Sequence, residues 1–431
     1  MLKTKKSAKF YMALVIFSLV GQVAWVVENM YLNVFIYKMF HASAEAISIM
    51  VAASAVTATV TTLLIGALSD KIGKRKLFIC GGYVLWGISI LSFAFIRTDV
   101  IHAIFPMTIH CATAGVSLTI LVDCIMTFFG SSANDAAFNA WLTDATDETN
   151  RGAIEGINAM MPLVSILVVF GGFMSLNQDL QESWTIIFSV IGGVVLLLGI
   201  AGFFLVEETA VKSEENAQYF ANIFYGFRPS VIKSNVPLYG TLVALALFNI
   251  SIQIFMPYLI LYYTEALGMD DYVLIFAPAI IVAAIFTGLY GKVFDQKGFQ
   301  SAILPTLGML ALGYVGLYFF RTTGPVFVSS MIMMCGFLGT GAMIGAQIRA
   351  HTPQKKAGMF QGLRIVGQVL IPGVIGPAIG AAILANADTI VNSDGTTSFV
   401  PNENIFLGAM VALVITALAL IPLFRLLKKQ N

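Results

Sequence analysis

The sequence predicts an all-α membrane protein in which twelve transmembrane helices form two pseudo-symmetric six-helix bundles. Of its 431 residues, 58% are hydrophobic and 11% are charged, whereas about 25% of the residues in a typical soluble domain are charged. Apolar runs recur along the chain, each long enough to cross a hydrocarbon core of about 30 Å as a helix. Similar polar turn sequences occur in both halves, which indicates an internal repeat.

Apolar runs between charge clusters and turn residues define the predicted helices. In the first half they lie at about 10–36, 46–68, 77–96, 120–142, 153–175 and 185–205. In the second half they lie at about 238–263, 272–291, 301–320, 326–348, 358–384 and 404–425. We therefore expect an N-terminal bundle over 1–206, a polar cytoplasmic linker over 207–235 and a C-terminal bundle over 236–431.

The distribution of basic residues predicts the orientation, because cytoplasmic loops carry an excess of Lys and Arg. With both termini cytoplasmic, Lys38, Arg97 and Arg321 fall in outside loops and Arg364 falls within a span. The other 20 of the 24 basic residues then face the cytoplasm. We expect a multi-pass protein of the inner or plasma membrane that retains its first helix, since no cleavage site follows the N-terminal lysines.

Two pairs of turn sequences carry the repeat. The segment Gly66–Gly73 recurs as Gly291–Gly298, with its acidic residue and glycines shifted by 225 positions. Residues 146–156 recur at 352–362 with a shift of 206. The first half therefore holds 19 extra residues between the two turns, which we assign to an excursion outside the membrane near 98–116.

The sequence lacks the patterns of metal and nucleotide chemistry. The four cysteines occur singly in apolar segments and are interpreted as small buried hydrophobic residues: Cys80, Cys111, Cys124 and Cys335. It contains no His/Cys cluster, no phosphate-binding glycine loop and no nucleophile paired with a base. We expect no enzyme activity, no resident cofactor and no nucleic-acid partner, and we expect an ion or solute gradient to supply energy.

The turn between the second and third predicted helices resembles the most widespread motif of the major facilitator superfamily of transporters. The motif runs from Gly66 to Lys76, and a degenerate copy lies at Gly291–Gly298. Together with the Ala140–Asp144 segment, the resemblance covers nearly the whole chain. It implies alternating access, in which two bundles rock around a solute site near the bilayer midplane.

The resemblance assigns gating, rather than solute binding, to a small set of motif residues: Gly66, Asp70, Gly73, Arg75 and, in the second copy, Asp295. A carboxylate at the end of the second helix can meet a neighbouring helix N-terminus and loop cations in one conformational state only. Asp70 and Arg75 are the principal candidates. The alternative is that these charges only anchor helix ends.

A second resemblance concerns the fourth helix. Residues 134–141, which precede the turn at 147–151, are similar to the corresponding segment of the glycoside-pentoside-hexuronide cation symporters, the relatives of melibiose permease. Sodium-coupled members carry aspartates in the second helix, but residues 46–69 contain no acid here. The resemblance therefore implies coupling to protons rather than to sodium.

Three carboxylates fall within predicted helices: Glu28, Asp123 and Asp135. An ionised Asp costs about 2.5–3.5 kcal/mol at the centre of a membrane helix, so such residues indicate function. In a low-dielectric cavity, a carboxyl group can bind and release a proton and can accept hydrogen bonds from sugar hydroxyls. Glu28 and Asp135 are the coupling candidates, with a buried structural carboxylate as the alternative. For Asp123, near the outer end of its helix, a structural role is favoured.

The other candidate residues are polar or aromatic and are expected to line one central cavity. They are Trp25, Asn29 and Asn134 in the first half, and Asn249, Gln253, Arg364 and Gln368 in the second. A cation within a span needs a partner, so we expect Arg364 to meet Glu28, Asp135 or a solute carboxylate, or to extend to the cytoplasmic edge.

Amides, an indole ring and two carboxylates suit a polyhydroxylated ligand. The sequence therefore favours proton-driven uptake of a small sugar or glycoside by a monomer. Proton-driven efflux of amphipathic or cationic compounds is the alternative. A non-transporting receptor or lipid scramblase is a third possibility, against which the preserved motif argues.

Overall fold

The computed structural model describes residues 7–104, 108–146, 151–208, 225–352, 362–392 and 395–428. Within these residues, eleven helices are long and apolar enough to cross a membrane. One of them, α14 (Tyr272–Phe319), has 48 residues and passes through the non-helical Gly298, so it contains two spans. The predicted fold class is confirmed, and the two parts of α14 account for the twelfth span.

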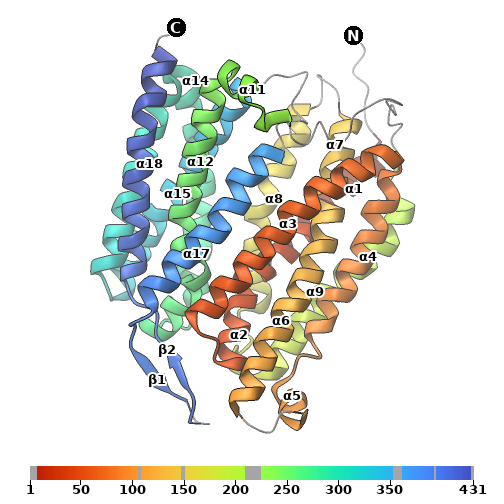
Figure 1. Cartoon of the computed structure of the whole chain (residues 1–431), viewed down its shortest axis with the longest axis vertical. Helices are drawn as coiled ribbons and strands as arrows, with labels where there is room; N and C mark the ends of the chain where they lie inside the picture. The colour runs from red at the N-terminus through yellow and green to blue at the C-terminus, as the bar shows by residue number, and fades with distance from the viewer. Residues whose placement is uncertain are drawn as a thin grey trace. The chain divides into compact units, whose positions relative to one another are not determined.

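The first half of the chain is helical throughout its described spans (Figure 1). Its elements are α1 (Ala8–Val26), η1 (Val27–Tyr31), α2 (Leu32–Phe40), α3 (Ala44–Ile72), α4 (Arg75–Phe93), α5 (Thr98–Ile104), α6 (Thr108–Gly130), η2 (Ser131–Phe138), α7 (Asn139–Ala145), α8 (Arg151–Phe173) and α9 (Gln181–Leu205). The segments η1 and η2 are π-helical and continue the helices on either side of them.

The second half adds a small β-hairpin to its helices. Its elements are η3 (Tyr225–Phe227), α11 (Pro229–Ser234), α12 (Val236–Phe255), η4 (Met256–Tyr258), α13 (Leu259–Leu261), η5 (Tyr262–Ala266), α14, α15 (Thr323–His351), η7 (Val366–Leu370), α17 (Ile371–Leu384), β1 (Thr389–Val391), β2 (Thr397–Phe399) and α18 (Asn404–Lys428). The segments η5 and η7 are π-helical, whereas η3 and η4 are 3₁₀ turns.

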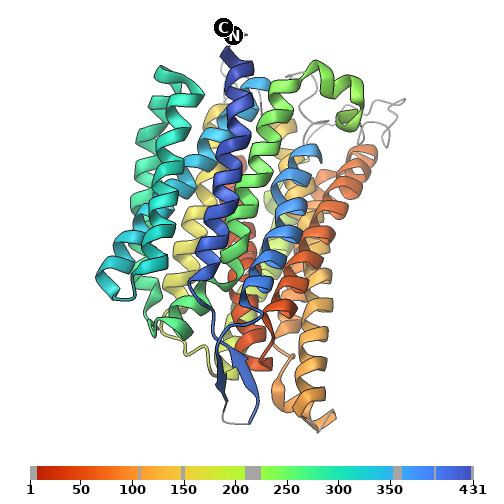
Figure 2. The ribbon, with the colours of Figure 1, turned by 60° about the vertical axis from the view of Figure 1, so that its left-hand side comes forward.

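Packing divides the described residues into two compact units, one within 1–42 and 56–223 and the other within 43–55 and 224–431. In the first unit, α4 packs along α9 and α1 packs along α8. In the second, α12 packs along α18, and the teal helices α14 and α15 run side by side in Figure 2. The domain boundaries expected from the sequence, at 206/207 and 235/236, stay a prediction.

Close contact between α4 and α9 depends on glycines. A Cβ added at Gly87 would lie 2.4 Å from the backbone nitrogen of Leu196, and one added at Gly192 would lie 2.7 Å from that of Leu91. Small residues of this kind allow membrane helices to approach closely enough for dispersion contacts. These two positions therefore fix the separation of α4 and α9.

The excursion expected near 98–116 is wrong in its extent. Residues 98–104 form the short helix α5, but α6 begins at Thr108, so the last nine residues of the segment already belong to the helix of the fourth span. No proline follows Pro106 in the sequence until Pro162, and the apolar run continues. The span Cys111–Ala145 contains 35 residues, more than the roughly 20 that a bilayer crossing requires.

The hairpin between α17 and α18 was not expected. Strands β1 and β2 pair antiparallel, with Thr389 opposite Phe399, and lie below the ends of α17 and α18 in Figure 1. The turn contains Gly395, whose φ of 81° favours glycine. Phe399 packs against the ring of Tyr258, so the hairpin rests on η4 of the same unit.

Candidate functional site

The predicted gating turn has a defined backbone geometry. Helix α3 ends at Ile72, and Gly73 follows with a left-handed φ of 69° and a hydrogen bond from its N–H to the Ser69 carbonyl. Gly298, its counterpart in the predicted repeat, has a φ of 77°. Only glycine adopts this conformation without steric cost. The two copies of the motif therefore use the same device to turn the chain.

Arg75 is the centre of a buried polar cluster in the first copy. Its residue is 3% exposed, and its Nε donates to Asp144 Oδ2 at 3.0 Å. Its Nη1 donates to the hydroxyl of Ser69 at 2.7 Å, and that hydroxyl donates to the Gly66 carbonyl. The cluster thus joins the end of α3, the start of α4 and the end of α7.

The other two acidic gating candidates are Asp70 and Asp295. The backbone of Asp70 lies in α3, but its side chain lies outside the described residues. Asp295 is exposed on α14, three residues before the kink at Gly298. Among the described side chains, Asp144 is an acidic partner of Arg75. The sequence had placed Asp144 in a segment that resembles the family, without a partner.

Glu28 is buried in the first unit beside the fourth span. Its side chain lies in η1, its residue is 8% exposed, and its Oε1 accepts a hydrogen bond of 2.9 Å from Thr127 of α6. Its Oε2 is buried and has no hydrogen-bond partner among the described residues. The Oε2 atom of this carboxyl group can therefore bind a proton or accept a hydrogen bond from a ligand.

Asp135 lies in η2, the π-helical segment that follows α6 in the fourth span. Its Oδ2 accepts a hydrogen bond of 3.0 Å from Ser131, four residues earlier. The amide of Asn139 donates to the backbone carbonyl of Asp135 rather than to its carboxylate. Asp135 is less buried than Glu28.

Asn134 joins three helices of the first unit. Its amide nitrogen donates to Tyr83 Oη at 2.7 Å, and its amide oxygen accepts a hydrogen bond of 3.4 Å from Trp25 Nε1. Tyr83 in turn donates to the carbonyl of Phe17, while the ring of Trp25 packs 5.0 Å from that of Trp86. Asn134 is 3% exposed, so its amide holds the Trp25 ring in place.

Several predicted residues coincide with π-helical segments. Glu28 and Asn29 lie in η1, Asn134 and Asp135 lie in η2, and Gln368 lies in η7. A π turn inserts an extra residue into a helix, changes the direction of the side chains around it, and is frequent at functional sites. These segments explain how polar side chains can be turned away from the apolar faces of the same helices.

The second unit contributes amides and one cation. The Nδ2 of Asn249 is buried and has no hydrogen-bond partner among the described residues, and Gln253 lies one turn further along α12, against Gly376. Arg364 donates from Nε to the side-chain oxygen of Gln368 at 3.2 Å. In the first unit, Asn29 is exposed, and its side-chain amide donates to the Trp25 carbonyl of its own helix.

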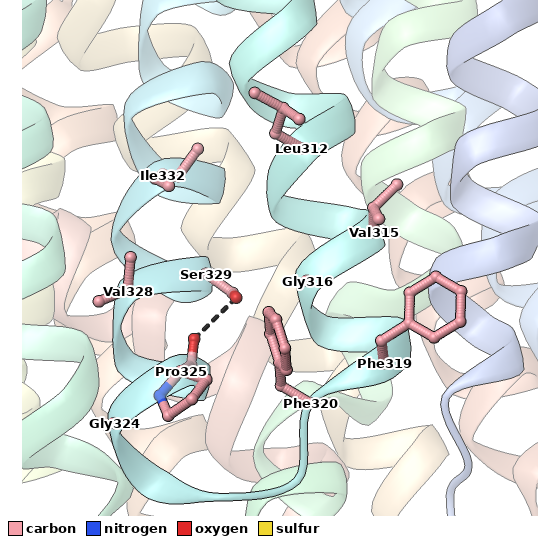
Figure 3. Close-up of a pocket in the computed structure, with 10 residues that line it drawn as sticks. All are labelled: Leu312, Val315, Gly316, Phe319, Phe320, Gly324, Pro325, Val328, Ser329 and Ile332. Atoms are coloured by element: carbon pink, nitrogen blue, oxygen red, sulfur yellow. Dashed lines mark hydrogen bonds between the residues drawn. The ribbon is translucent and has the colours of Figure 1, made fainter.

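A surface groove in the second unit contains none of the predicted residues. It encloses about 550 Å³ between α14 and α15 and is lined by Leu312, Val315, Gly316, Phe319, Phe320, Gly324, Pro325, Val328, Ser329 and Ile332. Figure 3 shows its one hydroxyl, that of Ser329, already donating to the Pro325 carbonyl at 2.7 Å. The groove therefore offers few polar groups to a polyhydroxylated ligand.

The spans, the buried carboxyl groups and the Arg75 cluster define a polytopic membrane transporter. A model of the family described as the Major Facilitator Superfamily matches residues 11–377. The chain therefore belongs to the major facilitator superfamily and is a transporter rather than an enzyme. No match is found among curated protein sequences.

Solved structures with the same fold cover nearly the whole chain. A D-xylose-proton symporter aligns with a TM-score of 0.72 at 14% identity, over 95% of this chain and 97% of that one. A bacterial homologue of the human lysosomal transporter Spinster, inward-facing and unoccupied, aligns at 0.72 and 13%, over 98% of each chain. The nucleoside transporter NupG aligns at 0.69 and 13%, over 96% and 98%. At these identities the likeness shows the fold alone.

Proposed function

We propose that the protein takes up a sugar- or glycoside-like solute together with protons by alternating access. The observation that carries the proposal is the burial of Glu28, which has one hydrogen-bonded oxygen and one oxygen without a partner. An acid retained in a membrane helix despite its cost indicates an ion pathway. Two proteins with the same fold support this solute class: one is a D-xylose-proton symporter and the other is a nucleoside transporter. A nucleoside is itself a glycoside.

The solute site is assigned by the chemistry of its side chains. Glu28 and Asp135 couple solute movement to protons. Trp25 stacks on a face of the sugar, and Asn134 holds the indole ring of Trp25 in position. The polar groups that bind solute hydroxyls are Asn29, Asn249, Gln253, Arg364 and Gln368. We propose that Arg364 remains at the solute site with Gln368, its hydrogen-bond partner.

The gate is assigned to the two turn motifs. In the first copy, Gly66, Asp70, Gly73 and Arg75 stabilise one conformation, supported by the bond between Arg75 and Asp144. Asp295 belongs to the second copy and contributes less, because it is exposed. We further propose that the protein works as a monomer in the cell membrane with both termini in the cytoplasm, in accord with the distribution of basic residues.

The test is solute-driven proton flux in proteoliposomes that contain the purified protein. Pentoses, hexoses, nucleosides, glycosides and amphipathic cations are added singly outside, and external pH is followed with a dye. Symport predicts external alkalinisation with one of the polar solutes and none in protein-free liposomes. Proton exchange with cations alone would contradict the proposal and assign the protein to the efflux class.

A further inference from the structure

A stripe of polar side chains runs along the fourth span at a spacing of four residues. It consists of Asp123, Thr127, Ser131 and Asp135, which share one helix face. The first three are almost completely buried, at 1%, 0% and 0% exposure. Glu28 meets this stripe through its hydrogen bond to Thr127. One turn of helix therefore separates Asp123 from the hydroxyl that binds Glu28.

The charges that act on Glu28 come from this stripe. Asp123 lies one turn of helix from Thr127 and Asp135 lies two turns from it, and both are negative when ionised. The thiol of Cys124, next to Asp123, lies within electrostatic reach of both acids. Like charges held together at low dielectric do not ionise independently, so the two acids titrate as a pair.

The hydrogen bonds locate the position for a proton. Glu28 Oε1 is occupied by Thr127, whereas Glu28 Oε2 is buried and has no hydrogen-bond partner among the described residues. Asp135 differs, because its carboxylate has its own donor in Ser131 and is less buried. The buried acid best placed to titrate with Glu28 is therefore Asp123.

We propose that Glu28 and Asp123 share one proton, and that this pair carries the part of the proton coupling assigned above to Glu28. Loading forms one O–H bond on a carboxyl oxygen of the pair. Release breaks that bond, passes the proton to water and leaves two carboxylates, with no oxidation or reduction. The transport role rests on the proposed function, whereas the shared proton can be measured without any solute.

The experiment is infrared difference spectroscopy of the carboxyl band against pH on the purified full chain. The band that titrates in the wild type and is lost in Glu28→Gln gives the midpoint of the pair. Asp123→Asn removes a like charge, so that midpoint should move to lower pH by about one unit or more. Asp123→Glu keeps the charge and should keep the wild-type midpoint.

Removing the Thr127 hydroxyl should shift the midpoint of the carboxyl titration in the opposite direction. Thr127→Val removes the donor that stabilises ionised Glu28, so the midpoint should move to higher pH. Thr119→Val is the matched control, because Thr119 is equally buried on α6. Among the residues that the structure describes, its hydroxyl donates to the Gly115 carbonyl of its own helix. Should Asp123→Asn fail to fold, as judged by gel filtration, Asp123→Ser removes the same charge and takes its place.

An unchanged midpoint in the folded Asp123 variant would overturn the shared proton, and equal shifts in the two threonine variants would overturn the role of Thr127 beside Glu28. The same variants in proteoliposomes separate this failure from that of the proposed function. Solute-driven proton flux with the wild-type pH profile in Asp123→Asn would reject the pair and keep symport. The predicted infrared shifts without proton flux for any solute would keep the pair and reject symport.

Discussion

Replacing Asp144 by Asn tests whether the Arg75 cluster is a stabilising element. The substitution keeps the size of the side chain and removes the charge that Arg75 Nε meets at 3.0 Å. Breaking a fully buried ion pair costs about 3–5 kcal/mol. The Asp144 side chain is 28% exposed and Arg75 keeps its bond to Ser69, so water and the hydroxyl reduce the expected cost to about 1.5–3 kcal/mol.

The assay is thermal unfolding of the purified protein in detergent. A loss of this size should lower the melting temperature by about 3–12 °C for a unit of this length. The matched control is Asp179→Asn, which breaks the 2.7 Å pair with Lys38, where the Asp179 side chain is 65% exposed. Exposed pairs contribute about 0–1 kcal/mol. Equal decreases in the two variants would refute the reasoning, and Asp144→Glu should recover part of the loss.

Two further predictions concern the first unit. Gly21→Ala should destabilise the protein by about 1–3 kcal/mol, because the added Cβ would lie 2.3 Å from Asn134 Nδ2. Gly81→Ala is the control in the same melting assay. It should be neutral or stabilising, because a Cβ added at Gly81 has nothing within 4 Å. Asp99→Asn should leave the pH profile of transport unchanged between about pH 5 and 8, because the hydrogen bond from Arg97 holds the pKa of Asp99 below its ordinary 3.8. This carboxylate loses its contribution only as pH falls through that lowered pKa, and a shifted profile would contradict the assignment.

The helices and several site residues could be predicted because the membrane makes polar groups costly. Glu28 and Asp135 stand out as acids in apolar runs, and both lie within spans. Thr127 was missed, since a hydroxyl in an apolar helix is unremarkable by itself. Its spacing of four residues from Asp123 and from Ser131 was the available signal.

Other features depend on tertiary structure or on weak local signals. A π turn changes the helical period by one residue within a few positions, so no repeating pattern reveals η1 or η2. The hairpin had a signal in Asp394-Gly395 between two short β-branched segments, which a search for membrane spans does not use. The pairing of Arg75 with Asp144 joins residues 69 positions apart and follows only from the fold.

Coupling through Glu28 is tested most directly by comparing two assays on Glu28→Gln with a transported solute. Counterflow measures exchange of solute across the membrane without net proton movement, whereas accumulation against a gradient requires the proton. We predict that Glu28→Gln retains counterflow and loses proton-driven accumulation. Accumulation at the wild-type level in this variant would contradict the account.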